Sequence, residues 1–122
     1  MKLDEITLFF NKISSKKNKK LDSKLKFEFD DGVVFVDDTK DKIEINNLDL
    51  KSDCSIKISN SNFEKLIKKE LNTSMALITG DIIIEGDMSI AIKISDLFTS
   101  FKFLISELFA FPNITLLVSQ SI

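Results

Sequence analysis

The 122-residue chain contains no histidine, arginine, tyrosine or tryptophan. The lack of histidine excludes imidazole as a general base, as the activator of a nucleophile and as a zinc ligand. The lack of arginine excludes the bidentate clamps that hold phosphate groups. The single cysteine, Cys54, cannot form an internal disulfide, which indicates a reducing compartment. We therefore expect no catalytic residues, no cofactor and no metal site, and a protein that is not an enzyme.

Charge is nearly balanced, with 17 lysines against 19 acidic residues and a formal net charge of −2. No nucleic-acid partner is expected, because proteins that bind nucleic acid normally present a strongly basic face. The one basic cluster lies at residues 16–20, within a segment (2–26) whose eight lysines and three acids give +5. This cluster could make a peripheral membrane contact with anionic lipid headgroups, but we favour a solvated loop.

Neither a leader nor a membrane-spanning segment is expected. Asp4 and Glu5 stand where a secretory signal would carry positive charge. The most apolar stretch, residues 97–122, is interrupted by two charged residues and by Pro112, which makes it a poor bilayer-spanning helix. A cytoplasmic location is the resulting expectation.

Apolar spacing in the first half of the chain predicts one helix followed by strands. Leu3, Ile6, Phe10 and Ile13 recur every three or four residues, which is typical of an amphipathic helix over residues 3–13. Short apolar runs bounded by turn residues then predict strands at 25–29, 33–36, 42–45 and 54–59.

Acidic residues gather in the two turns between the first three of these strands. Asp30 and Asp31 lie in the first turn, and Asp37, Asp38 and Asp41 lie in the second. Paired carboxylates could bind Ca²⁺. Aspartate is also favoured in turns, because its side chain accepts hydrogen bonds from nearby backbone N–H groups. We expect turn formation rather than a metal site.

The second half of the chain predicts mostly helices. An S-x-x-E capping box at residues 61–64 opens a helix that reaches about Leu71. Thr73 caps a second, short helix that Gly80 ends. The remaining elements are a strand at 81–85, a helix at 88–98 capped by Asp87, a helix at 99–111, and an apolar run at 114–118 that suits a strand or a helix.

The order of elements predicts a single α+β domain over residues 1–122 with a mixed sheet. The first three strands form an antiparallel meander, because short turns join them. Two helices join the strand at 54–59 to the strand at 81–85. We therefore expect those two strands to be parallel, linked by a right-handed crossover.

The segment from Ser52 to Phe98 resembles the sterol carrier protein-2 (SCP-2) domain family, in its bacterial, stand-alone form. The first half of the chain matches the family in element order, so the resemblance covers roughly residues 3–98. The landmarks are Asp53-Cys54 opening a strand, Ser61-Asn62-Phe63 opening a helix, Leu71-Asn72, Gly80, Gly86-Asp87-Met88, Lys93 and Leu97-Phe98.

The resemblance implies a five-stranded mixed sheet with helices over one face and an apolar tunnel between the two layers. Such a tunnel holds a fatty acyl chain, a sterol or another lipid, without catalysis. Cys54 would then be a buried, inert thiol. The residues that we expect to line the tunnel are Phe10, Phe63, Ile67, Met75, Ile78, Ile84, Met88, Ala91, Ile94, Phe98 and Phe101.

Two other functions remain open from the sequence. Some bacterial SCP-2 relatives assist ubiquinone biosynthesis by holding the isoprenoid intermediate for partner enzymes, and this chain could do the same. Alternatively, the chain could be an interaction module that forms a homodimer through its apolar tail and binds no ligand.

The tail over residues 99–122 is longer and richer in phenylalanine than the resemblance predicts. Its apolar side chains would cover more than one face of a helix, and surplus apolar surface of this extent rarely stays exposed. We expect it to close over the tunnel and to contribute to a homodimer contact.

Truncation after Phe98 should therefore expose apolar surface and weaken lipid retention. The measurements are the fluorescence of a hydrophobic dye, the amount of co-purified lipid and the oligomeric state. A truncated protein that stays soluble, keeps its lipid and keeps its oligomeric state would show that the tail is neither lid nor interface.

Overall fold

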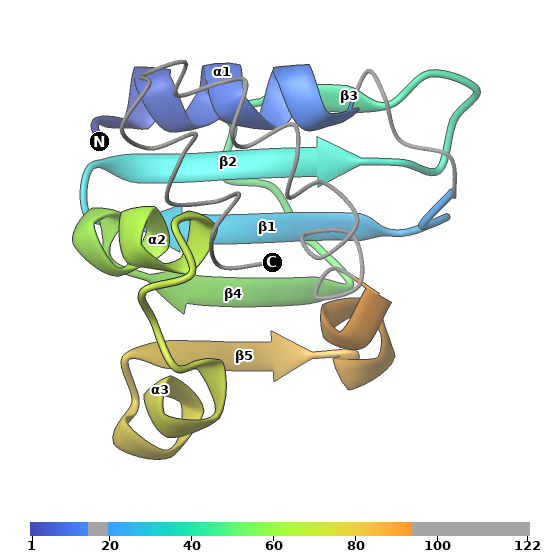
Figure 1. Ribbon diagram of the computed structural model, residues 1–122. Helices are drawn as coiled ribbons and strands as arrows, with labels where there is room; N and C mark the ends of the chain where they lie inside the picture. The colour runs from blue at the N-terminus through green and yellow to red at the C-terminus, as the bar shows by residue number, and fades with distance from the viewer. Residues whose placement is uncertain (15–19, 94–122) are drawn as a thin grey trace.

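A five-stranded mixed sheet in the order β3-β2-β1-β4-β5 forms the centre of the computed structural model, which describes residues 1–14 and 20–93 (Figure 1). This confirms the predicted α+β class. The predictions for the tail over 99–122 fall outside the described residues. The strands are β1 (Lys24–Phe29), β2 (Gly32–Asp37), β3 (Glu44–Asn46), β4 (Cys54–Ile58) and β5 (Ile82–Gly86).

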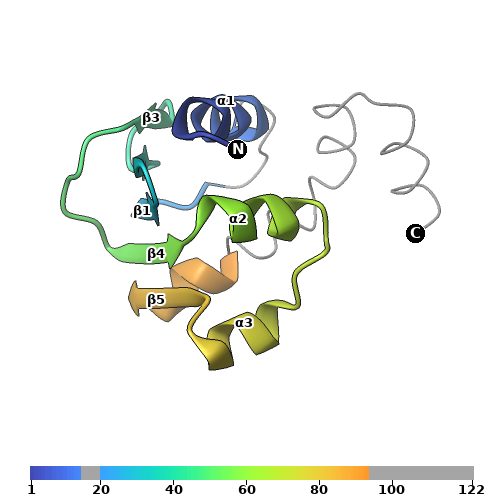
Figure 2. The ribbon, with the colours of Figure 1, turned by 90° about the vertical axis from the view of Figure 1, so that its left-hand side faces the viewer.

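The helices lie on one side of this sheet (Figure 2). They are α1 (Leu3–Ser14), α2 (Asn60–Ile67) and α3 (Thr73–Thr79), and residues 88–93 are helical as well. The connector over residues 47–53 runs along the other side (Figure 2). In the described part of the chain the sheet therefore has an inner face, which the helices cover, and an outer face, which the connector crosses.

The pairing of β4 with β5 differs from the prediction. These strands are antiparallel, with Ile58 opposite Ile82, and the parallel pair of the sheet is β1 with β4. The predicted crossover assumed that α2 and α3 together carry the chain back to the end of the sheet where β4 begins. Two helices in succession instead return the chain to the end of β4 that it left, so β5 runs back beside β4.

Helix boundaries also correct the sequence analysis. α2 begins two residues earlier than predicted, because Ser59 and not Ser61 is its N-cap and accepts a hydrogen bond from the Asn62 N–H. It ends at Ile67 instead of Leu71. The N-cap of α3 is Asn72 rather than Thr73.

The predicted ends of two other elements are confirmed. Gly80 ends α3 in the left-handed conformation, with φ of 83°. The Asp87 carboxylate accepts from the Ser89 N–H at 2.9 Å, as a cap should. A glycine that ends a helix and an aspartate that caps one are both local signals, which is why they can be predicted from sequence.

Phenylalanine rings fill the core between α1, α2 and the inner face. Phe63 of α2 is fully buried and meets Phe29 with ring centroids 5.1 Å apart and Phe10 at 5.6 Å. Phe10 in turn meets Phe27 at 4.8 Å. Edge and offset contacts of this kind are favourable beyond simple burial. They attach both helices to the β1 region of the sheet.

The acidic turn at residues 30–31 joins the beginnings of two helices, through hydrogen bonds to residues far away in the chain that the expectation of local turn bonding did not include. The Asp31 carboxylate accepts from the Leu3 N–H at 2.9 Å and from Asn60 Nδ2 at 2.8 Å. Asp30 exchanges backbone and side-chain hydrogen bonds with Asn60. The hydrogen bond from Asn60, followed by that from Leu3, lowers the pKa of Asp31.

The lowered pKa of Asp31 predicts a contribution to acid unfolding. The ionised carboxylate stabilises the fold above the ordinary aspartate pKa, and this contribution is lost as pH falls through the lower folded-state pKa. Asp31→Ala should lower the thermal midpoint at neutral pH and should flatten the fall of the midpoint on acidification. Thermal scans from neutral to acidic pH measure this. Asp41→Ala, which removes an exposed carboxylate from another turn, is the control and should leave both quantities unchanged.

Candidate functional site

Every side chain that the described strands direct toward the helices is apolar. Strand alternation and the pairing register place these residues on the inner face, and all of them belong to the core or pack against it. They are Leu25, Phe27, Phe29, Val34, Val36, Ile45, Cys54, Ile56, Ile58, Ile82 and Ile84. The inner face is thus an apolar floor without a charged group.

Along one row of this floor, burial decreases from β2 toward β5. One row across the sheet contains Val34, Phe27, Ile56 and Ile84, each paired with the next. Val34 is 0% exposed, Phe27 1% and Ile56 7%, whereas Ile84 is only half-buried. Ile82, the other floor residue of β5, is 5% exposed, so the weaker cover of β5 is confined to the part of the strand around Ile84.

The residues predicted to line a tunnel fall into four groups. Phe10, Phe63 and Ile67 are buried in the core. Ile84 and Ala91 are half-buried. Ile94, Phe98 and Phe101 lie outside the described residues. Met75, Ile78 and Met88 are 56%, 81% and 52% exposed.

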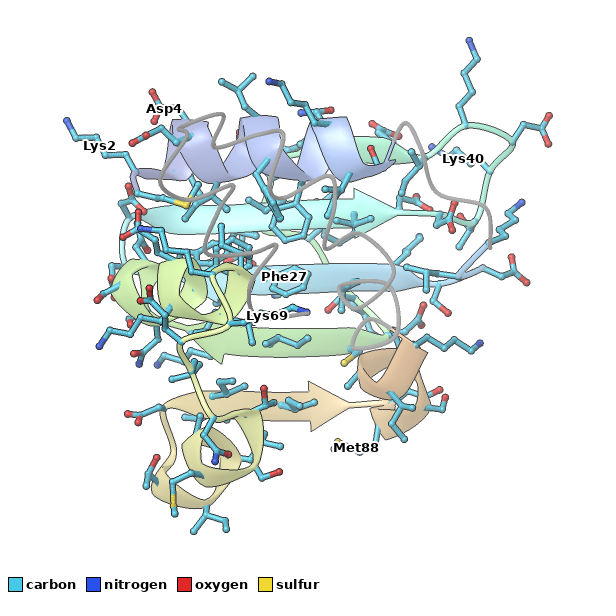
Figure 3. All side chains as sticks on the ribbon, in the orientation of Figure 1. Lys2, Asp4, Phe27, Lys40, Lys69 and Met88 are labelled. Carbon is cyan, nitrogen blue, oxygen red and sulfur yellow. The ribbon has the colours of Figure 1, made fainter. Side chains whose placement is uncertain are left out.

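The structure thus brings part of the predicted set together. Figure 3 shows Phe27 at the centre of the floor and Met88 beyond the β5 edge. The three exposed side chains lie on α3 and at the start of the 88–93 helix, the two segments that flank β5 along the chain. The tunnel itself stays a prediction.

Two cavities have described walls. One, of about 440 Å³, lies at the ends of β1 and β4, where the floor residues Phe29 and Ile58 meet charged residues that include Glu28, Asp30 and Asp81. The other, of about 410 Å³, lies against the connector and is lined by Phe35, Leu48 and Leu50 together with charged residues. Neither has the uncharged lining that an acyl chain requires.

Phe35 is a buried residue whose position the sequence analysis missed. It alternates with Val34 and Val36 of the inner face, so its side chain lies on the outer face, where it is 3% exposed. The ion pair of Lys26 with Asp49, at 2.9 Å, fixes the connector over this face. The unbroken apolar run at 33–36 could have signalled a strand covered on both faces.

The described residues offer little for chemistry. Over 1–14 and 20–93, no three cysteine or acidic side chains lie close enough together to hold a metal ion. Cys54 is 1% exposed on the floor, and burial, with a smaller contribution from Asp87, raises its thiol pKa. None of the described helices is long and apolar enough to cross a bilayer.

The sequence of the chain matches the model of the SCP-2 sterol transfer family over residues 6–99. The chain belongs to the SCP-2 family. This match confirms the predicted resemblance. Lipid binding or transfer is the function of the family as a whole. No curated protein matches the chain significantly.

Solved structures share this SCP-2 fold at low sequence identity. The sterol carrier protein domain 2 of Helicoverpa armigera is 20% identical, with a TM-score of 0.65 over 80% of this chain and 88% of that one. Sterol carrier protein 2 of Yarrowia lipolytica is 17% identical, with a TM-score of 0.59 over 78% and 84%. The ubiquinone synthesis protein UbiJ-SCP2 is 15% identical, with a TM-score of 0.61 over 80% and 88%.

The burial of Cys54 predicts a thiol that resists modification in the folded SCP-2 domain. A small thiol reagent at neutral pH should react at least about a hundredfold more slowly with the native protein than with protein unfolded in urea, because the thiolate is the reactive form and burial disfavours it. Absorbance or mass spectrometry follows the reaction. Equal rates for native and unfolded protein would contradict the buried position.

Proposed function

We propose that this SCP-2 domain binds and carries a lipid with an acyl, sterol-like or isoprenoid chain, without catalysis. The ligand lies in an apolar tunnel between the inner face of the sheet and the helices. The single observation that carries the proposal is the uncharged floor whose burial falls off along the row from Val34 to Ile84. Ile84 is left with apolar surface that a hydrocarbon chain could cover.

The driving force is the removal of apolar surface from water. At roughly 25 cal/mol for each Å² buried, a long hydrocarbon chain needs few polar contacts to bind, so specificity for the tail is broad. In this proposal Ile84 and Ala91 line the tunnel, and Met75, Ile78 and Met88 form its rim. Methionine suits a rim because its flexible thioether repacks around ligands of different shape.

A second candidate function is to hold an isoprenoid intermediate for enzymes of ubiquinone synthesis. The similarity in fold to UbiJ-SCP2 supports it. The two candidates differ in the ligand and in the partners. Native mass spectrometry of protein purified from its source cells should detect a bound acyl lipid in the first case. Polyprenyl compounds, or co-purified quinone-pathway enzymes, would favour the second.

Adjacent residues on β5 provide a matched pair of variants for the tunnel. Ile84 belongs to the inner face, whereas Ile83 points to the outer face and is 43% exposed. Ile84→Gln should weaken binding of a fluorescent fatty acid by roughly fivefold, because an apolar contact worth about 1 kcal/mol is lost. Ile83→Gln should leave binding unchanged within about twofold, because its side chain never meets the ligand.

Titration of the fluorescent lipid measures both affinities, and thermal midpoints show that both variants fold. Equal effects of the two substitutions on binding would contradict a ligand on the inner face. A homodimer in native mass spectra with no bound lipid would instead support the interaction module without a ligand.

A further inference from the structure

The cavity of about 410 Å³ against the connector has no part in the lipid-binding function proposed above. It lies on the outer face of the sheet, on the side away from the helices (Figure 2). Its volume is within the range of roughly 300 to 1,000 Å³ that is usual for pockets that bind small molecules. We call it the outer pocket, and the side chains that matter for its chemistry are Phe35, Leu48, Leu50, Lys24, Lys40 and Lys51.

Polar contacts hold the connector in a defined shape beside this pocket. The Leu48 N–H donates to Asn46 Oδ1 at 2.9 Å, and the Leu50 N–H donates to the Leu48 carbonyl at 3.0 Å. The second hydrogen bond closes a three-residue turn. Asp49, in the middle of that turn, pairs with Lys26 of β1. The positions of the two leucines are therefore set by the fold.

The apolar part of the outer pocket combines a buried side chain with exposed ones. Phe35 is 3% exposed, whereas Leu48 is 58% and Leu50 46% exposed. A compact apolar group that entered the pocket would remove leucine surface from water, which is worth roughly 25 cal/mol for each Å². The turn thus presents apolar surface to a ligand.

Both carboxylates that line the outer pocket have protein partners. Asp37 accepts hydrogen bonds from the Thr39 N–H, at 2.9 Å, and from the Thr39 hydroxyl. Glu44 pairs with Lys40 at 3.2 Å. Three lysines and two carboxylates line the pocket, so its lining carries a net positive charge.

The excess positive charge belongs to Lys24 and Lys51. Among the described residues neither side chain forms an ion pair. The backbone of Lys24 exchanges two hydrogen bonds with Asp53, each of 2.8 Å, and Lys51 precedes Asp53 by two residues. Strand β1 and the end of the connector therefore bring two unpaired ammonium groups to the same end of the pocket.

We propose that the outer pocket binds a small organic anion with a compact apolar body, such as an aromatic carboxylate. The apolar body lies against Phe35 and the two leucines. The carboxylate lies beside Lys24 and Lys51, because charge-assisted hydrogen bonds form there and the net charge of the lining favours an anion. This site is on the opposite face of the sheet from the proposed lipid tunnel, so the two proposals stand or fall separately.

The test titrates cinnamate, and its neutral analogue cinnamyl alcohol, into the isotope-labelled full chain and follows the backbone amide signals by NMR. Cinnamate should shift the signals of Lys24, Phe35 and residues 47–52. The alcohol should bind at the same place roughly fivefold more weakly, because it has the same apolar body without the charge.

Three variants separate the two halves of the site. Leu48→Ser removes exposed apolar surface, and Lys51→Glu reverses a charge that has no partner, so both variants should keep the wild-type thermal midpoint. Each should weaken cinnamate binding about fivefold. Lys57→Glu is the matched control, because Lys57 is an exposed lysine on the outer face of β4 that does not line this pocket, and it should change binding by less than about twofold.

Several outcomes would overturn the assignment. Cinnamate that shifts only the helices and the signal of Ile84 has entered between the sheet and the helices instead. Equal affinities for acid and alcohol, or equal effects of Lys51→Glu and Lys57→Glu, would exclude a specific anion site. If cinnamate shifts nothing and Leu48→Ser dissociates a dimer in native mass spectra, the occupant is a second copy of the chain. Titration of the fluorescent fatty acid on the same variants reports separately on the carrier function.

Discussion

The parallel pairing of β1 with β4 is the constraint that makes the two faces of the sheet different. β3 runs in the same direction as β1, so the chain must travel back along the sheet before β4 can begin. Residues 47–53 make that return on the outer face, where Asp49 pairs with Lys26 and Phe35 is buried. The inner face is left to the helices, and its strands present only apolar side chains to them.

The decrease in burial across the inner face follows from how β5 joins the sheet. β5 is an edge strand, reached through α2 and α3, and it pairs only with β4 among the described strands. Phe63 attaches α2 to Phe10 and Phe29, near the β1 side of the floor. α3 has seven residues and buries one of them, Ala76, so it covers little of β5. The rim proposed for the tunnel lies along this edge of the sheet.

Polar residues in this small domain serve mainly to hold chain segments in place. Asp31 and Asn60 join the beginnings of α1 and α2, and Asp53 accepts from the Lys24 N–H at 2.8 Å where β1 and β4 begin. These carboxylates have protein partners and are not free for a ligand.

The sequence by itself determined the class of fold and most of the secondary structure, because alternation, helical spacing and turn residues are local signals. The strands at 25–29, 33–36 and 54–59, the end of α3 at Gly80 and the family resemblance were all readable in this way. The site was readable only in part: Phe63 and Ile67 show a helical spacing that predicts burial. Exposure of Met75 and Ile78 depends on how far α3 reaches over β5, and no local pattern encodes that distance.

Only the tertiary structure decided the direction of β5, the face on which Phe35 is buried and the left-handed backbone of Lys69. Each depends on contacts between segments far apart in the chain or on which of several competing caps forms. Ser59 and Ser61 could both begin α2, and the fold selects Ser59, whose neighbour Asn60 also bonds to the distant turn at Asp30 and Asp31. Sequence determines which hydrogen bonds are available locally, whereas long-range packing determines which of them are made.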